Sequence, residues 1–191
     1  MIYLASRSPR RVELLRQVGI EFTLMPIDID ETRAATESPA EYVCRMAVTK
    51  ARIATEQIGG QQEACAVLAA DTTIALDGDT IGKPANREQC CKILRQLSGR
   101  QHLVLSAVAL AVRGNVASRL SQNRVSFRTL SESEIESYCA TEEPMDKAGA
   151  YAIQGKAAIF IEHLEGSYSA VMGLPLYETA ELLREAEIAM F

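Results

Sequence analysis

The chain has 191 residues, of which 48% are hydrophobic, and a formal net charge of −5. This is enough for one sizeable core, and we expect a single domain over residues 1–191. The acidic balance disfavours nucleic acid as a partner of the whole surface, and no apolar run is long enough to span a membrane. The five cysteines fit no zinc spacing and are interpreted as core thiols of a reducing compartment. Without a signal-peptide pattern, we expect a cytoplasmic protein.

The first distinctive stretch is a helix start rich in positive charge. Residues 2–5 are apolar and predict a buried strand, and a helical pattern follows with Ser8 as N-cap and Pro9 in the first turn. Arg10 and Arg11 then crowd the positive end of the helix dipole, which destabilises the helix unless an anion lies there. A solvated basic turn is the alternative. The location after a first strand favours a site for a small phosphate-bearing ligand.

The next two segments add an acidic loop and a buried lysine. Residues 20–25 alternate like a strand and lead into an acidic run ending at Glu31, which is either a solvated loop or a metal site. A capping box at residues 38–41 starts a helix that we expect to end near residues 59–60. Lys50 falls on the apolar stripe of this helix. Its side chain therefore either extends to solvent, which is favoured when the helix is taken alone, or meets an anion.

Asp71 stands between two apolar runs. Residues 65–70 predict a strand covered on both faces that Asp71 ends, and residues 72–76 resume strand character. An ionised carboxylate in such surroundings is unfavourable unless it is paired or binds a metal. Asp71 is therefore a candidate acid/base group or metal ligand, with a carboxylate that caps backbone N–H groups as the alternative. Lys83 follows within Gly-Lys-Pro at 82–84, where its flanking residues restrain the backbone.

The rest of the chain continues the alternation of strands and helices. A helix follows Asn86, Ser131 and Glu134 form a second capping box, and a final helix begins near Pro175. The other expected strands span 103–112, 116–127 and 157–161. The loop at 145–156 is rich in small residues, and such loops often carry function. Its Asp146-Lys147 is interpreted as a surface pair, and Gln154 offers both a donor and an acceptor to a base edge.

Five short motifs stand in order along nearly the whole chain. They are Leu4-Ala5-Ser6-Arg7-Ser8-Pro9-Arg10-Arg11, Ala70-Asp71-Thr72, Gly82-Lys83-Pro84, Asp146-Lys147-Ala148-Gly149-Ala150-Tyr151 with Gln154-Gly155, and Gly173-Leu174-Pro175. As a set, they resemble the Maf family of nucleoside triphosphate pyrophosphatases. The departure is Arg7, where relatives often carry a small residue.

The resemblance implies an α/β fold with an elongated, twisted mixed sheet flanked by helices, and two lobes with a central cleft. It implies a homodimer, a divalent metal (Mg²⁺ or Mn²⁺), and hydrolysis of a nucleoside triphosphate to the monophosphate and pyrophosphate with Asp71 as proton acceptor. Asp71-Thr72 and Gln154-Gly155 resemble the branch that acts on dTTP and UTP. In that branch, positions matching Arg11, Thr72 and Gln154 are associated with substrate choice.

These expectations combine into one hypothesis for the site. The triphosphate would be bound by Ser8, Arg10, Arg11, Lys50 and Lys83. Glu31 and Asp71 would face the metal, and Thr72 and Gln154 would contact the pyrimidine. One alternative is a nucleotide-binding regulator of cell division or septum formation without turnover, and another is an enzyme that removes modified pyrimidine triphosphates. Asp71 beside lysines favours catalysis, because a sensor needs the cations but not the carboxylate.

Overall fold

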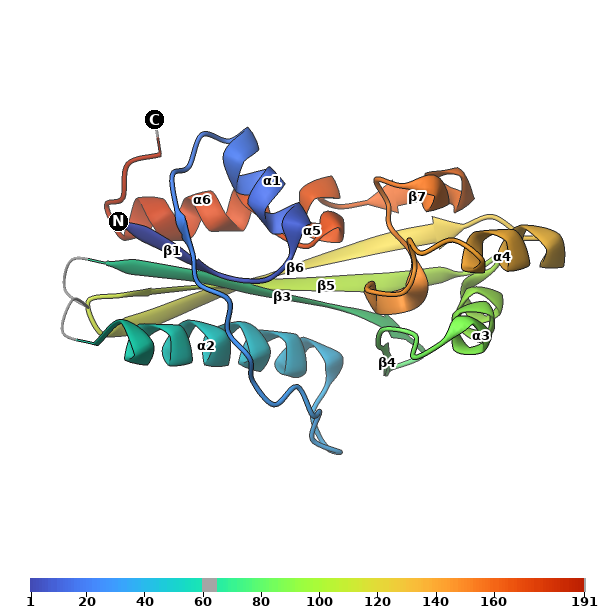
Figure 1. Ribbon diagram of the computed structural model, residues 1–191, viewed down its shortest axis with the longest axis horizontal. Helices are drawn as coiled ribbons and strands as arrows, with labels where there is room; N and C mark the ends of the chain where they lie inside the picture. The colour runs from blue at the N-terminus through green and yellow to red at the C-terminus, as the bar shows by residue number, and fades with distance from the viewer. Residues whose placement is uncertain (60–64, 191) are drawn as a thin grey trace.

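The structure is a computed structural model that describes residues 1–59 and 65–190, and its centre is one mixed seven-stranded sheet (Figure 1). The strand order is β2-β1-β3-β5-β6-β7, and β4 pairs separately with β3. The strands are β1 (Ile2–Ala5), β2 (Thr23–Leu24), β3 (Ala66–Leu76), β4 (Asp79–Ile81), β5 (Gln101–Val112), β6 (Asn115–Phe127) and β7 (Ile161–Glu165). β1 runs parallel to β2 and β3, and the other pairs are antiparallel. The expected elongated mixed sheet is confirmed.

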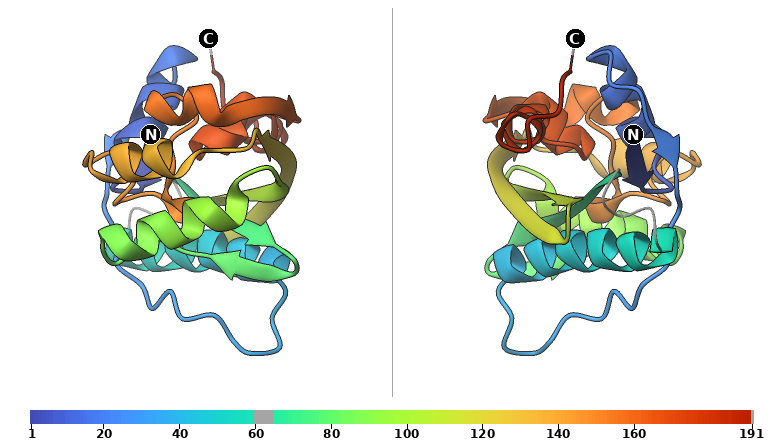
Figure 2. Two further views of the ribbon diagram at one scale, coloured as in Figure 1. Left: turned by 90° about the vertical axis from the view of Figure 1, so that its right-hand side faces the viewer. Right: turned by 90° about the vertical axis from the view of Figure 1, so that its left-hand side faces the viewer.

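Helices cover both faces of the sheet. They are α1 (Pro9–Gln17), α2 (Pro39–Ile58), α3 (Arg87–Leu97), α4 (Glu132–Cys139), α5 (Tyr168–Met172) and α6 (Leu176–Glu185), with short 3₁₀ helices η2 (Ala148–Ala150) and η3 (Lys156–Phe160). α2 packs under β3, β5 and β6, whereas α1 and α6 lie on the opposite face (Figures 1 and 2). In the part of the chain that the structure describes, no helix is long and apolar enough to cross a membrane.

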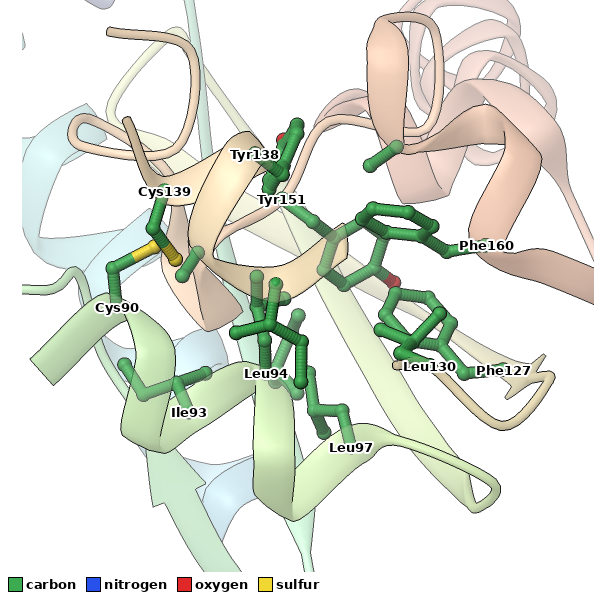
Figure 3. Close-up of a cluster of buried hydrophobic side chains, with 14 of the residues drawn as sticks. Cys90, Ile93, Leu94, Leu97, Phe127, Leu130, Tyr138, Cys139, Tyr151 and Phe160 are labelled. Carbon is green, nitrogen blue, oxygen red and sulfur yellow. The ribbon is translucent and has the colours of Figure 1, made fainter. Parts of the chain in front are cut away.

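Three hydrophobic clusters divide the molecule into two lobes. At one end, Val67 and Ala69 of β3 pack toward α2, and Leu68 and Ala70 pack toward α1 and α6. This alternation explains why the run is apolar throughout, because both faces of the strand are covered. At the other end, the third cluster joins α3 and α4 to the far ends of β5 and β6 around Tyr151 (Figure 3).

β3 is continuous through both lobes, but its pairing is interrupted along one edge. β5 pairs with it from Ala66 to Ala75 on one side. On the other side, β1 pairs with Ala66–Ala69 and β4 with Ile74–Leu76. No other described strand pairs with residues 70–73 on that side. We call this stretch the edge gap, and it places Asp71 and Thr72 at an opening in the middle of the sheet.

Three local expectations were wrong. Asp71 does not end a strand, because β5 continues to pair through it and holds it opposite Ala107. Residues 20–25 form a strand only at Thr23–Leu24, the two residues that pair with Tyr3 and Leu4 of β1. Residues 157–161 mostly form η3, in which Ala157 and Phe160 point into the core at a three-residue spacing.

The capping boxes and the cysteines agree with expectation. Ser38 and Ser131 both form complete capping boxes, and α2 ends at Ile58. The expected helix end near residues 59–60 therefore agrees at Gly59, while Gly60 lies outside the described residues. All five cysteines are free, with Cys44 half-buried and the other four buried.

Candidate active site

A cavity of about 630 Å³ opens at the edge gap between the two lobes. Its volume falls within the range of small-molecule sites. Its walls come from the start of α1, the segment before α2 and α2 itself, the middle of β3, residues 82–83 and 146–154, and the end of α5 at residues 171–173. Every residue predicted for the site lines it: Ser8, Arg10, Arg11, Glu31, Lys50, Asp71, Thr72, Lys83 and Gln154.

Lys50 joins the two carboxylates of the site. Its Nζ lies 2.7 Å from Asp71 Oδ1 and 2.7 Å from Glu31 Oε1. Lys50 and Asp71 are only 8% and 9% exposed, so the interpretation in which Lys50 extends to solvent was wrong. α2 directs the lysine at Asp71 because Lys50 shares the helix face of Met46, Ala47 and Ala54, which pack on the sheet.

Glu31 is the more exposed member of this group. It lies in the long segment between β2 and α2, which crosses from the sheet edge to the α2 side (Figure 2). Partial burial acts to raise its pKa, but the hydrogen bond and charge of Lys50 outweigh burial and hold the pKa below its usual value. The charges of Lys83 and Arg11 act in the same direction. Glu31 is therefore an ionised carboxylate at the cavity wall at neutral pH.

The chemistry of this group suits a divalent cation held together with an anionic ligand. Carboxylate oxygens are the ligands that Mg²⁺ and Mn²⁺ prefer, and Mg²⁺ is commonly held by one or two carboxylates plus phosphate oxygens. Glu31 and Asp71 supply two such groups, and both carboxylates are hydrogen-bonded to Lys50 Nζ. Across residues 1–59 and 65–190, no cluster of three or more His, Cys, Asp or Glu residues could hold a metal ion. Glu31 and Asp71 would therefore hold a divalent cation only together with oxygens of a bound ligand or water.

The two arginines of α1 are held from the opposite side of the cavity. Arg11 Nε donates to the Gly173 carbonyl at 2.8 Å, and Arg10 Nε donates to the Met172 carbonyl at 3.2 Å. Burial lowers the pKa of Arg11, while the charge of Asp71 opposes this shift. Arg10 Nη1 also lies 3.7 Å from Asp146 Oδ2, and Arg11 Nη1 donates to Ser6 Oγ. Each guanidinium has five N–H donors, so each keeps donors that no described residue uses. A partly desolvated guanidinium also gains more from an anion than a solvated one.

Ser8 stands at the N-cap of α1 as expected, but its hydroxyl makes no capping hydrogen bond. Instead, Ser6 Oγ accepts the Ser8 N–H at 3.1 Å and a hydrogen bond from Arg11 Nη1 at 3.3 Å. The Ser8 hydroxyl forms no hydrogen bond with another described residue, and Pro9 has no N–H, so the N–H groups at the start of α1 that a ligand could meet at the cavity wall are those of Arg10 and Arg11. This is the arrangement that binds phosphate at a helix N-terminus.

Thr72 and Gln154 approach the cavity from different elements. Thr72 Oγ1 lies 2.8 Å from Ser106 Oγ and 3.4 Å from the Gly173 carbonyl. Gln154 is exposed, and its amide forms no hydrogen bond with other described residues. Its donor and acceptor are both available to a ligand.

Sequence reasoning missed two residues that line the cavity and one that lies directly behind it. Lys147 was interpreted as part of a surface pair, yet its side chain is mostly buried and donates to the Glu143 carbonyl at 3.1 Å as well as to Asp146. Tyr42 also lines the cavity, and burial raises its pKa to about 12. Ser106 lies behind Thr72. The position of Lys147 within the Asp-Lys-Ala-Gly-Ala-Tyr motif was the one available signal.

Comparison with known proteins adds a family and named relatives. A family model described as Maf-like protein matches residues 1–186. The dTTP/UTP pyrophosphatase of Alkalilimnicola ehrlichii is 51% identical over 189 residues, covering 98% of this chain and 93% of that protein. The dTTP/UTP pyrophosphatase of Aromatoleum aromaticum is 52% identical over 192 residues, covering 95% and 93%. The dTTP/UTP pyrophosphatase of Nitrosospira multiformis is 49% identical over 199 residues, covering 100% and 96%.

Proposed function

The chain belongs to the Maf-like family, and from this premise we propose that it is a hydrolase that cleaves dTTP and UTP to the monophosphate and pyrophosphate. The observation that carries the proposal is the Lys50 bridge between Glu31 and Asp71, which faces the basic start of α1 across one cavity. Cations bind a triphosphate, and a buried carboxylate beside them activates water. The names of three relatives with about half of their residues identical support the same substrates.

The triphosphate binds through the cationic wall of the cavity. Arg10 and Arg11 present guanidinium N–H groups, and Lys83 presents an ammonium group. The Ser8 hydroxyl and the backbone N–H groups of Arg10 and Arg11 donate to a phosphate at the helix N-terminus. These groups neutralise charge that grows on the leaving pyrophosphate. In phosphoryl transfer such positioning and electrostatic stabilisation supply most of the rate enhancement.

Asp71 acts as the general base. A water oxygen forms a bond to the α-phosphorus, the bond from that phosphorus to the bridging oxygen breaks, and the water proton passes to Asp71. Lys50 orients the Asp71 carboxylate through the 2.7 Å hydrogen bond. A divalent cation, Mg²⁺ or Mn²⁺, held by Glu31, Asp71 and phosphate oxygens would supply further neutralisation of phosphate charge.

Substrate choice resides in Arg11, Thr72 and Gln154. Thr72 and Gln154 offer hydroxyl and amide groups to the edge of a pyrimidine, and Arg11 links the phosphate wall to the Gly173 loop beside Thr72. Buried polar groups that lose their partner discriminate strongly between similar ligands. We also propose that the chain forms a single domain and that the protein is a cytoplasmic homodimer. Its partner is a nucleotide rather than a nucleic acid.

The test is pyrophosphate release from a panel of nucleoside triphosphates with Mg²⁺, with Mn²⁺ and with a chelator. We expect metal-dependent release from dTTP and UTP, and a 10²- to 10⁴-fold lower kcat for Asp71→Asn, on the order of one general base. Asp77→Asn is the matched control, because Asp77 lies beyond the end of the same strand, exposed and paired with Arg100. Binding of triphosphates without release would contradict the proposal and favour the regulator of cell division.

A further inference from the structure

We infer that Ser106, which does not line the cavity, is a positioning residue that sets the direction of the Thr72 hydroxyl. Thr72 Oγ1 is then only a hydrogen-bond acceptor toward the ligand, and it accepts a hydrogen bond from the N3–H of thymine or uracil. This inference rests on the proposed function and adds to it a preference for uracil and thymine over cytosine.

Ser106 and Thr72 are fixed relative to one another by the sheet. They are directly opposite residues on β5 and β3, and Ser106 is fully buried. The hydroxyl oxygens are 2.8 Å apart. On its other side, Ser106 Oγ lies 2.6 Å from the carbonyl oxygen of Ala170 in α5. The three oxygens form a chain from the interior of the protein to the cavity.

The direction of this chain follows from counting protons. The Ala170 carbonyl has no hydrogen, so the bond at 2.6 Å must be donated by Ser106. A hydroxyl has one proton, so Ser106 can only accept from Thr72. Thr72 therefore donates its proton to Ser106 Oγ at 2.8 Å. The Gly173 carbonyl is 3.4 Å away, a distance at which a hydrogen bond is weak. Only the lone pairs of Thr72 Oγ1 remain for a ligand.

An acceptor at this position distinguishes pyrimidines by the state of N3. Thymine and uracil carry a hydrogen on N3 and donate, whereas cytosine has a lone pair there and would place two acceptors against each other. An unpaired polar contact of this kind commonly costs a wrong base one to two orders of magnitude in kcat/KM. Sugar hydroxyls can also donate to Thr72, but they are the same in UTP and CTP. A contact with the sugar therefore leaves the ratio of the two substrates unchanged.

The experiment measures kcat/KM for UTP and CTP with wild type, Ser106→Ala and Ser121→Ala. Ser121 is the matched control because it is a buried serine directly opposite Ser106 on β6, one strand farther from the cavity. In Ser106→Ala the Thr72 proton loses its acceptor and can turn toward the ligand. We expect wild type to prefer UTP by about 100-fold, and Ser106→Ala to lower that ratio by about 10-fold, on the order of one hydrogen bond. Ser121→Ala should keep the wild-type ratio.

A second measurement needs no variant and stands even if Ser106→Ala fails to fold. Wild type is assayed with N3-methyl-UTP and with 5-methyl-UTP, which adds the same methyl group away from N3. We expect N3-methyl-UTP to be a poor substrate and 5-methyl-UTP a good one. Equal use of UTP and CTP, an unchanged or equally scaled ratio in Ser106→Ala, or full turnover of N3-methyl-UTP would overturn the inference. Failure to hydrolyse any triphosphate would instead reject the proposed function.

Discussion

Replacing Lys50 with Met removes the cation between Asp71 and Glu31 while keeping most of the apolar stem. The side chains of Lys50 and Asp71 are 11% and 12% exposed, whereas that of Glu31 is 50% exposed. Removing one partner of a buried ion pair typically costs about 3–5 kcal/mol, because the other charge is left unpaired. The half-exposed Glu31 adds little, since exposed pairs contribute about 0–1 kcal/mol. Because the pair borders an open cavity, we expect a loss of about 3 kcal/mol in the free energy of unfolding.

The assay is urea denaturation at neutral pH without nucleotide or metal. Arg52→Met is the control, because Arg52 is an exposed cation two residues along the same helix, and it should change stability by less than about 0.5 kcal/mol. The double variant Lys50→Met/Asp71→Asn should recover about 2 kcal/mol, and together with the single variant Asp71→Asn it completes the cycle that measures the coupling of the pair. If Lys50→Met is as stable as wild type or more stable, the ion pair makes no net contribution to folding and the reasoning is refuted.

Two further predictions concern the lobe that contains α3, α4 and Tyr151. Burial holds the pKa of His102 at about 4, below its ordinary 6.5. Between pH 6.5 and 4 this histidine is therefore protonated in the unfolded chain but not in the folded protein. The free energy of unfolding falls by on the order of 3 kcal/mol as the pH falls through that window. In urea denaturation, the variant His102→Gln should not show this pH-dependent loss of stability, whereas His163→Gln, at an exposed position, should show it. Equal pH profiles of stability for the two variants would contradict the assignment of the loss to His102. In Gly155→Ala the added Cβ would lie 2.4 Å from Glu143 Oε1 and displace that carboxylate from Tyr138 and the Lys156 N–H. We expect the free energy of unfolding to fall by about 1–3 kcal/mol and the KM for UTP to rise. An unchanged melting temperature and an unchanged KM would show that Glu143 does not hold the loop of Gln154.

The parts of the fold that local chemistry determines could be predicted from the sequence. Capping boxes at Ser38 and Ser131 located two helices, and the uninterrupted apolar run before Asp71 indicated a strand covered on both faces. The two strands that were wrong depend on neighbours instead. β2 comprises only the two residues that pair with β1. At the start of η3, the N–H groups of Lys156 and Ala157 donate to the Glu143 carboxylate rather than to a neighbouring strand.

The residues of the cavity were predictable one at a time, but their partners were not. Arginines at a helix start and a carboxylate between apolar runs are visible as chemical anomalies in the sequence. That Lys50 meets Asp71, or that Ser106 stands behind Thr72, depends on how α2 lies on the sheet and on the register of β3 with β5. Neither relation has a local signal, because the residues are 21 and 34 positions apart in the chain.

The register of β3 has a consequence for how the chain is specified. Most strands are held in register by apolar side chains on one face and polar ones on the other, but β3 is apolar on both faces beside the edge gap. A slip of one residue would therefore still bury hydrophobic side chains while turning Asp71 away from Lys50 and Thr72 away from Ser106. The ion pair and the hydroxyl chain penalise that slip, so the same polar contacts that we assign to catalysis and base choice also select the correct strand pairing.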